Sequence, residues 1–133
     1  MSIIFIGKKS RKENSRMRVA VIGSRGLNTD VGRWIPEGTT AIVSGGAMGI
    51  DHCAREYAQK NNIPLLEFLP DYEKNGRKAP LIRNEEIIAH ADLVIAVWDG
   101  SSRGTKFVIN RCRQRKKALL VYMPKGAVAG ENK

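Results

Sequence analysis

The sequence predicts a three-layer α/β fold with a central, mostly parallel sheet of about five strands. From Arg18 onward, short apolar runs alternate with stretches of helical period, which is typical of repeated βα units. The runs are rich in Val, Ile and Leu, as expected of strands that are covered on both faces. A chain of 133 residues suits one domain with a modest core.

Each element follows from a local pattern. Strands are expected at 18–22, 40–44, 64–68, 93–97 and 118–122. The first connection, 28–39, is interrupted by Gly32 and Pro36, so it has room for at most two helical turns.

Two helices show apolar stripes that can pack on the sheet. Ile50, Ala54 and Ala58 recur at helical spacing in the first of them, which ends near Asn62 because Pro64 cannot continue a helix. The second helix is expected around Val108.

The composition favours anionic partners. Lys and Arg number 23 against 13 Asp and Glu, a net charge of +10.

The two ends of the chain are expected to lie outside the domain. Residues 1–16 form a basic extension, for which a disordered segment is favoured over an arm that contacts nucleic acid, and residues 124–133 form a tail. Cys53 and Cys112 suggest no disulfide, which fits a cytoplasmic protein. The longest apolar run is too short to span a bilayer, so no membrane partner is expected.

Two glycine-rich turns carry the functional argument. Segment 44–51 reads SGGAMGID after the second strand, and segment 99–105 reads DGSSRGT after the fourth. A turn without side chains exposes backbone N–H groups, and a following helix adds its unsatisfied donors. Because ligands in open α/β sheets sit beyond the carboxyl ends of the strands, these turns and Gly23-Ser24-Arg25 should converge on one phosphate-bearing ligand.

Several candidate residues have structural alternatives. Arg25 and Arg83 are expected to contact phosphate, although Arg25 is otherwise a solvated loop cation and Arg83 otherwise pairs with Glu85, Glu86 or a loop carboxylate. Asp51 serves a ligand or only complements a helix dipole.

Two further residues stand beside the fourth strand and the turn that follows it. Thr105 contacts phosphate or caps a helix that begins after Gly104. Trp98 is expected to cover the core in preference to stacking on a base.

His52 and His90 have no second ligand at metal spacing, so no metal is predicted. No cofactor is predicted either.

The motifs resemble those of the SLOG superfamily, which joins the DNA-processing protein A proteins to the Lonely-guy phosphoribohydrolases. The closest pattern is that of its small YspA-like, cpYpsA-related members. The resemblance covers about residues 18–122, and the nucleotide-binding domain that it implies is expected at 17–123. The motifs that carry it are VIGSR at 21–25, SGGAxGxD at 44–51, DYEK at 71–74, GRKAP at 76–80, RN at 83–84, ADLV at 91–94 and RGT at 103–105.

The resemblance implies a Rossmann-like sheet and a homo-oligomer that binds a nucleotide or a nucleotide-derived ligand, as a sensor or a processing protein. The predicted nucleotide- and phosphate-binding residues are Gly23, Ser24, Arg25, Ser44, Gly45, Gly46, Gly49, Asp51, Arg83, Asn84, Gly104 and Thr105. No catalytic residue is assigned.

Two alternatives come from the same superfamily. The hydrolase motif ends in a Glu that acts in cleavage of the ribose–base bond, and Val108 stands at that position, which argues against hydrolysis. Binding of single-stranded DNA, as in DNA-processing protein A, is suggested by a basic segment at 106–117, whose alternative is a solvated helix face. Few aromatic residues are present for stacking on successive bases.

Overall fold

The computed structural model describes residues 16–124. The extension predicted for 1–16, apart from Arg16, and the tail predicted for 124–133, beyond residue 124, lie outside the described residues. The strands are β1 (Arg18–Gly23), β2 (Ala41–Ser44), β3 (Leu65–Glu67), β4 (Leu93–Val97) and β5 (Leu119–Tyr122). All five predicted strands are confirmed to within two residues at each end.

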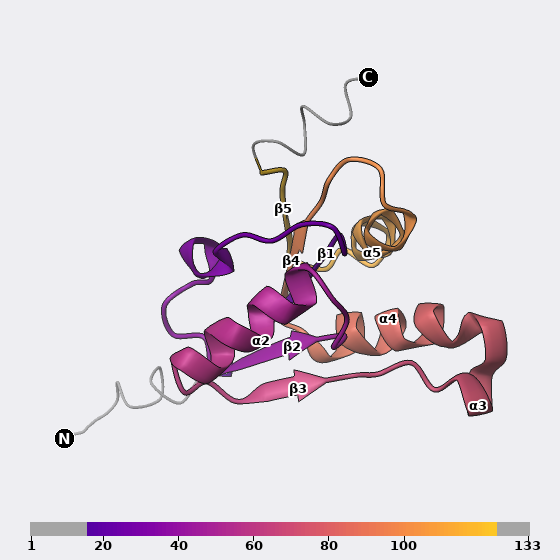
Figure 1. Ribbon diagram of the computed structural model, residues 1–133, viewed down its shortest axis with the longest axis horizontal. Coiled ribbons are helices and arrows are strands. Elements are labelled where there is room, and N and C mark those ends of the chain that lie inside the picture. The colour runs from indigo at the N-terminus through magenta and orange to yellow at the C-terminus, as the bar shows by residue number, and fades with distance from the viewer. Residues whose placement is uncertain (1–15, 125–133) are drawn as a thin grey trace.

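The helical elements alternate with the strands (Figure 1). They are η1 (Val31–Trp34), α2 (Ile50–Lys60), α3 (Tyr72–Asn75), η2 (Gly76–Lys78), α4 (Ala79–His90) and α5 (Arg103–Gln114). The short η1 fits the brief first connection, and α2 gives way at Asn61 and at the left-handed Asn62, as expected. The helix α4 shows no clear apolar stripe in the sequence, because its apolar residues are spread around it. Ile87 and Ile88 are buried, whereas Leu81 and Ile82 are exposed.

The sheet is parallel throughout and has the order β3-β2-β1-β4-β5. The chain therefore builds outward from β1 to one edge and then returns to place β4 on the other side of β1. This reversal is the topological switch point at which open α/β sheets bind ligands. The predicted Rossmann-like three-layer architecture is confirmed.

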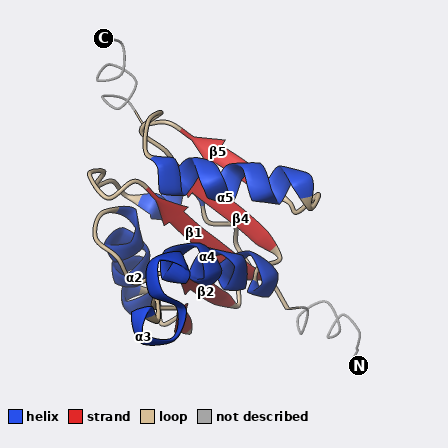
Figure 2. Cartoon of the chain, turned by 90° about the vertical axis from the view of Figure 1, so that its right-hand side faces the viewer, coloured by secondary structure: helices blue, strands red, loops and turns tan. Residues whose placement is uncertain are grey.

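Helices cover both faces of the sheet. The helices α4 and α5 pack against one face, in front of the strands in Figure 2, and α2 with η1 packs against the other. Successive strand residues alternate between two cores: Val19 and Val21 belong to the core under α2, and Ala20 and Ile22 to the core under α4 and α5. This double coverage explains why the strands are apolar without interruption.

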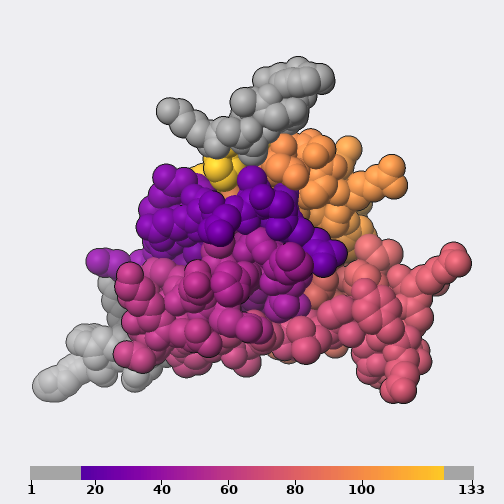
Figure 3. All heavy atoms as spheres, viewed as in Figure 1, coloured from indigo at the N-terminus to yellow at the C-terminus, as the bar shows by residue number. Residues whose placement is uncertain are grey.

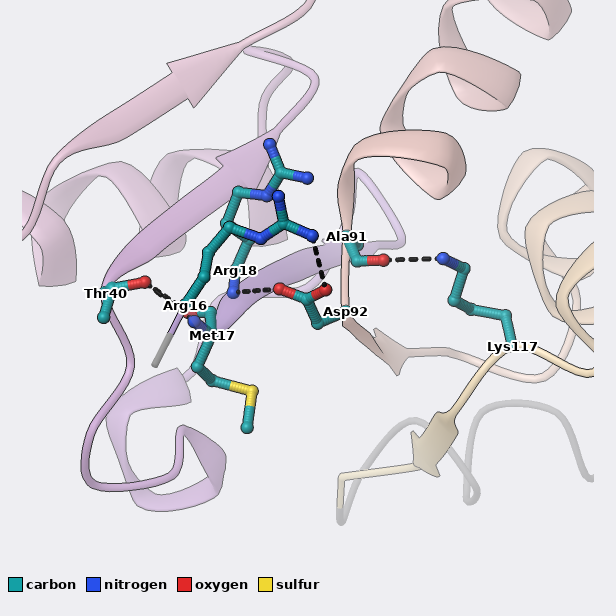
Figure 4. Close-up of polar contacts among 7 residues, drawn as sticks. All are labelled: Arg16, Met17, Arg18, Thr40, Ala91, Asp92 and Lys117. Carbon is teal, nitrogen blue, oxygen red and sulfur yellow. Dashed lines mark hydrogen bonds and ion pairs between the residues drawn. The ribbon is translucent and has the colours of Figure 1, made fainter. Parts of the chain in front are cut away.

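The amino edge of the sheet is held together by Asp92 (Figure 4). Its Oδ2 accepts a 2.8 Å hydrogen bond from the Arg18 backbone N–H, and its Oδ1 lies 3.4 Å from Nη2 of Arg16. The Arg18 N–H and then the Arg16 guanidinium hold the pKa of Asp92 below its ordinary value, although partial burial acts in the opposite sense. Nearby, Lys117 Nζ donates to the Ala91 carbonyl at 2.7 Å. These contacts fix the edge opposite the predicted site.

Candidate ligand site at the carboxyl edge of the sheet

A cavity of about 380 Å³ lies at the carboxyl ends of the strands. Its walls come from the loops that follow β1, β2, β3 and β4 and from the first turns of α4 and α5. Ten of the twelve predicted site residues line it: Gly23, Ser24, Arg25, Gly45, Gly46, Asp51, Arg83, Asn84, Gly104 and Thr105. Segments distant in sequence therefore meet where the topology places a ligand.

The glycine loop after β2 takes its shape from backbone angles that favour glycine. Gly46 and Gly49 have φ of 72° and 73°. At Gly49 a Cβ would also overlap the Arg25 carbonyl group and lie 2.6 Å from the Ser24 carbonyl oxygen. Gly49 therefore packs the β2 loop against the β1 loop and does not line the cavity. Ser44, the other predicted residue outside the lining, is fully buried, and its Oγ has no hydrogen-bond partner among residues 16–124.

Asp51 is a buried carboxylate in the first turn of α2. Its Oδ2 accepts a 3.1 Å hydrogen bond from the Ala47 N–H, whereas its buried Oδ1 has no hydrogen-bond partner in the described part of the chain. Burial raises the pKa of Asp51, against the lowering effects of the Ala47 N–H and of the Arg83 charge. Asp51 thus supports the glycine loop while remaining part of the cavity wall.

Ser24 joins the loops that follow β1 and β4. Its N–H donates to the Val97 carbonyl at 3.0 Å, its Oγ accepts from the Asp99 N–H at 3.0 Å, and the same Oγ lies 2.9 Å from the Ser102 Oγ. The side chain is 1% exposed. Ser24 therefore positions the wall of the cavity, whereas the neighbouring Arg25 is exposed beside it.

The turn after β4 is partly satisfied by its own carboxylate. Asp99 Oδ1 accepts 2.8 Å hydrogen bonds from the backbone N–H groups of both Ser101 and Ser102. Burial by itself would raise the pKa of Asp99, but the two backbone donors together with the hydroxyl groups of Ser24 and Ser101 outweigh it, and the pKa is lowered. Three amides of the predicted phosphate turn, those of Asp99, Ser101 and Ser102, are thus occupied internally, and the donors that remain for a ligand include those of the first turn of α5.

The start of α5 differs from the prediction. The helix begins at Arg103 with Ser102 as its N-cap residue, so Thr105 does not cap it. The turn held by Asp99 starts the helix before Gly104, and Thr105, 5% exposed, becomes a first-turn residue of the cavity wall. The Lys106 N–H is the one that bonds back to the Ser102 carbonyl. The preceding three N–H groups therefore have no partner within the helix.

Arg83 connects the loops after β2 and β3 to α4. Its Nη1 donates to the Gly45 carbonyl at 2.8 Å and to the Phe68 carbonyl at 3.3 Å, and its Nε donates to Asn84 Oδ1 at 2.9 Å. The expected alternative, an ion pair with Glu85 or Glu86, is not formed among the described residues. A Cβ at Gly45 would lie 2.6 Å from Nη1, so this glycine makes room for the guanidinium.

Other residues of the lining were not predicted. Leu69, Pro70 and Tyr72 follow β3, and Pro80 lies in the first turn of α4. The signals available were the motifs at 71–74 and 76–80, which contain Tyr72 and Pro80. Val108 also lines the cavity and is 2% exposed, so a valine stands where the hydrolase motif has its glutamate.

Trp98 is not in the lining. Its ring packs beside the core under α4 and α5, and its Nε1 donates to the Ser102 carbonyl at 3.0 Å. This placement agrees with the expectation that it covers the core.

The basic segment at 106–117 is partly neutralised within the protein. Arg111 and Arg115 pair with Glu85 at 2.7 and 2.8 Å, and Lys117 bonds to a carbonyl. Within residues 16–124, no three His, Cys, Asp or Glu side chains form a group that could hold a metal ion. No helix in that range is both long and apolar enough to cross a membrane.

Comparisons with family models, with curated proteins and with solved structures found no match to this chain. The geometry of the cavity is therefore the basis for inferring a function.

Proposed function

We propose that the protein binds a nucleotide or a nucleotide-derived ligand in the cavity at the carboxyl edge of the sheet. The observation that carries this proposal is the convergence of four loops, with Arg25, Arg83 and the start of α5, on one cavity of about 380 Å³. A volume of this size lies within the range of small-molecule sites.

A phosphate group fits best at the α5 side of the cavity. The first-turn N–H groups of α5 carry the positive end of the helix dipole, and Gly104 has no side chain to keep an anion away. Arg25 is exposed beside them and adds a full charge with planar donors. Arg83 contributes its charge, but two of its hydrogen bonds already hold the loops after β2 and β3, and a third goes to the neighbouring Asn84.

Binding is favoured over hydrolysis of a ribose–base bond. Glycoside hydrolysis ordinarily uses two carboxylates, one on each side of the bond that breaks. Asp51 is the only carboxylate among the described lining residues, and Val108 has no group that transfers a proton or stabilises a cation.

The cavity also suits a small ligand better than a nucleic-acid strand. Half of the six cations in the basic segment, namely Arg111, Arg115 and Lys117, are engaged within the protein. Tyr72 is the only aromatic residue in the described lining, whereas strand binding uses several stacking side chains. The homo-oligomer and the cytoplasmic location implied by the sequence remain predictions.

Thermal unfolding in the presence of candidate ligands tests the proposal. The panel consists of nucleoside mono-, di- and triphosphates, ADP-ribose and short oligonucleotides. A ligand at 100 times its Kd stabilises the folded state by about 2.7 kcal/mol, which raises Tm by several degrees. Steeply salt-dependent stabilisation by oligonucleotides alone would support DNA binding instead.

The matched variants are Arg25→Ala and Arg113→Ala. Both remove one exposed arginine, but Arg113 lies near the end of α5, outside the cavity lining. We expect Arg25→Ala to weaken nucleotide binding about tenfold or more and Arg113→Ala to leave it at the parent value. Binding that is equally affected by both variants, or no binding by the parent, would overturn the proposal.

A further inference from the structure

The chemistry of the cavity is unevenly distributed along the sheet. Polar residues and the α5 N-terminus lie beyond β1 and β4, whereas Leu69, Pro70, Tyr72 and Pro80 lie on the side beyond β3. The strand order puts β3 and β4 three strand spacings apart, about 14 Å. A bare phosphate reaches only one of these two sides.

The apolar side is exposed although it adjoins a polar cavity. Leu69 is 63% exposed and Tyr72 is 61% exposed. Leu69 lies against the β2 loop, because a Cβ at Gly46 would be 2.5 Å from its Cδ2. The segment that carries α3 stands out from the body of the molecule on the right of Figure 3. An exposed aromatic ring on the rim of a cavity offers a flat face to a ligand.

The backbone of Tyr72 is well defined by its neighbour. Asp71 caps α3: its Oδ1 accepts from the Lys74 N–H at 3.1 Å, and its carbonyl accepts from the Asn75 N–H at 2.9 Å. The Tyr72 side chain itself makes no hydrogen bond within residues 16–124 and is not part of either buried core. Its ring is therefore open to a ligand.

We propose that Tyr72 is the platform on which the base of the ligand stacks, with the ligand lying across the strand ends and its phosphate at the start of α5. This inference rests on the proposed function and narrows it to ligands that carry a phosphate, a sugar and a base. Stacking is tolerant of base identity, because every base has a π face. Tyr72 therefore selects for the presence of a base and not for one particular base.

Titration calorimetry on the parent and on variants tests the assignment. The probes are adenosine, guanosine, cytidine and uridine 5′-monophosphates, with ribose 5-phosphate as the probe that lacks a base. Tyr72→Ala should weaken binding of the nucleotides roughly 5- to 150-fold. It should leave ribose 5-phosphate binding nearly unchanged, and Tyr72→Phe, which keeps the ring, should restore nucleotide affinity.

Two further variants identify the cause of any loss. Arg25→Ala should weaken nucleotides and ribose 5-phosphate together, because it acts on the phosphate. Leu81→Ala removes an apolar side chain that is 44% exposed on α4 and outside the cavity lining, and it should bind as the parent does.

The outcomes separate this inference from the proposed function. If the parent binds nucleotides and Tyr72→Ala binds them equally well, the platform is refuted and nucleotide binding stands. If ribose 5-phosphate binds the parent as tightly as the nucleotides, the base makes no contribution and the platform is again refuted. If the parent binds none of the five probes, the platform is refuted, whereas the proposed function fails only if the parent also binds no nucleoside di- or triphosphate and no ADP-ribose.

Discussion

Gly23→Ala should destabilise the protein, because Gly23 packs tightly against residues of β4 and α2. A Cβ there would overlap the Val97 carbonyl oxygen and lie 2.7 Å from Cγ1 of Ile50. Overpacking of this kind costs about 1–3 kcal/mol. Displacing the Val97 carbonyl also weakens its 3.0 Å hydrogen bond from the Ser24 N–H, which adds about 0.5–1.5 kcal/mol. The lower backbone entropy of alanine returns roughly 0.5–1 kcal/mol.

We therefore expect the free energy of unfolding to fall by about 2 kcal/mol, within limits of roughly 0.5 and 4 kcal/mol. This is a substantial share of the ~5–15 kcal/mol typical of a domain. Urea unfolding followed by far-UV circular dichroism measures the change, with the slope of the transition expected to stay constant. The control is Gly26→Ala, because nothing lies within 4 Å of the added Cβ and its φ is not positive. The control should be neutral or gain up to about 1 kcal/mol. Equal midpoints for the two variants would refute the reasoning.

Three more changes test other parts of the structure. Gly104→Ala meets no atom within 4 Å and should stabilise α5 by up to about 1 kcal/mol while weakening nucleotide binding, as thermal unfolding and calorimetry would show; tighter binding would contradict a phosphate beside it. Asp92 has a lowered pKa, so its contribution is present above about pH 4 and is lost as the pH falls through the folded-state value. Asp92→Asn should therefore have a lower free energy of unfolding than the parent at pH 7. As the pH falls from about 5 to 3, the free energy of unfolding measured in urea titrations should decrease less in the variant than in the parent; parallel pH profiles would exclude this role. Glu85→Gln removes both ion pairs of α4 with arginines of the α5 region and should cost about 1 kcal/mol, less in 1 M NaCl; a cost independent of salt would argue against an ionic origin.

The strands and the glycine loops were predictable because their physical constraints act on adjacent residues. A strand covered on both faces must be apolar throughout, and a loop with φ near 70° at Gly46 and Gly49 needs glycine. Because all strands are parallel, knowledge of the strand ends was enough to gather eight of the predicted residues at one cavity. The other two, Arg83 and Asn84, lie on α4 and were predicted from the motif resemblance.

The remaining features depend on partners that the sequence does not display. Arg83 was expected to contact phosphate, with a carboxylate as its alternative partner, but its partners within the protein include backbone carbonyls, which any residue supplies. Asp99 fills amides of its own turn, and this became visible only with the turn geometry. Tyr72 was overlooked because the four-residue α3 is too short to show a periodic pattern.

The hydrogen bonds of Arg83 to the Gly45 and Phe68 carbonyls also bear on the kinetics of ligand capture. They hold the two loops at a fixed separation before any guest arrives, so little chain entropy remains to be lost on association. The observed association rate should then rise linearly with guest concentration, without the plateau that a slow loop closure would impose.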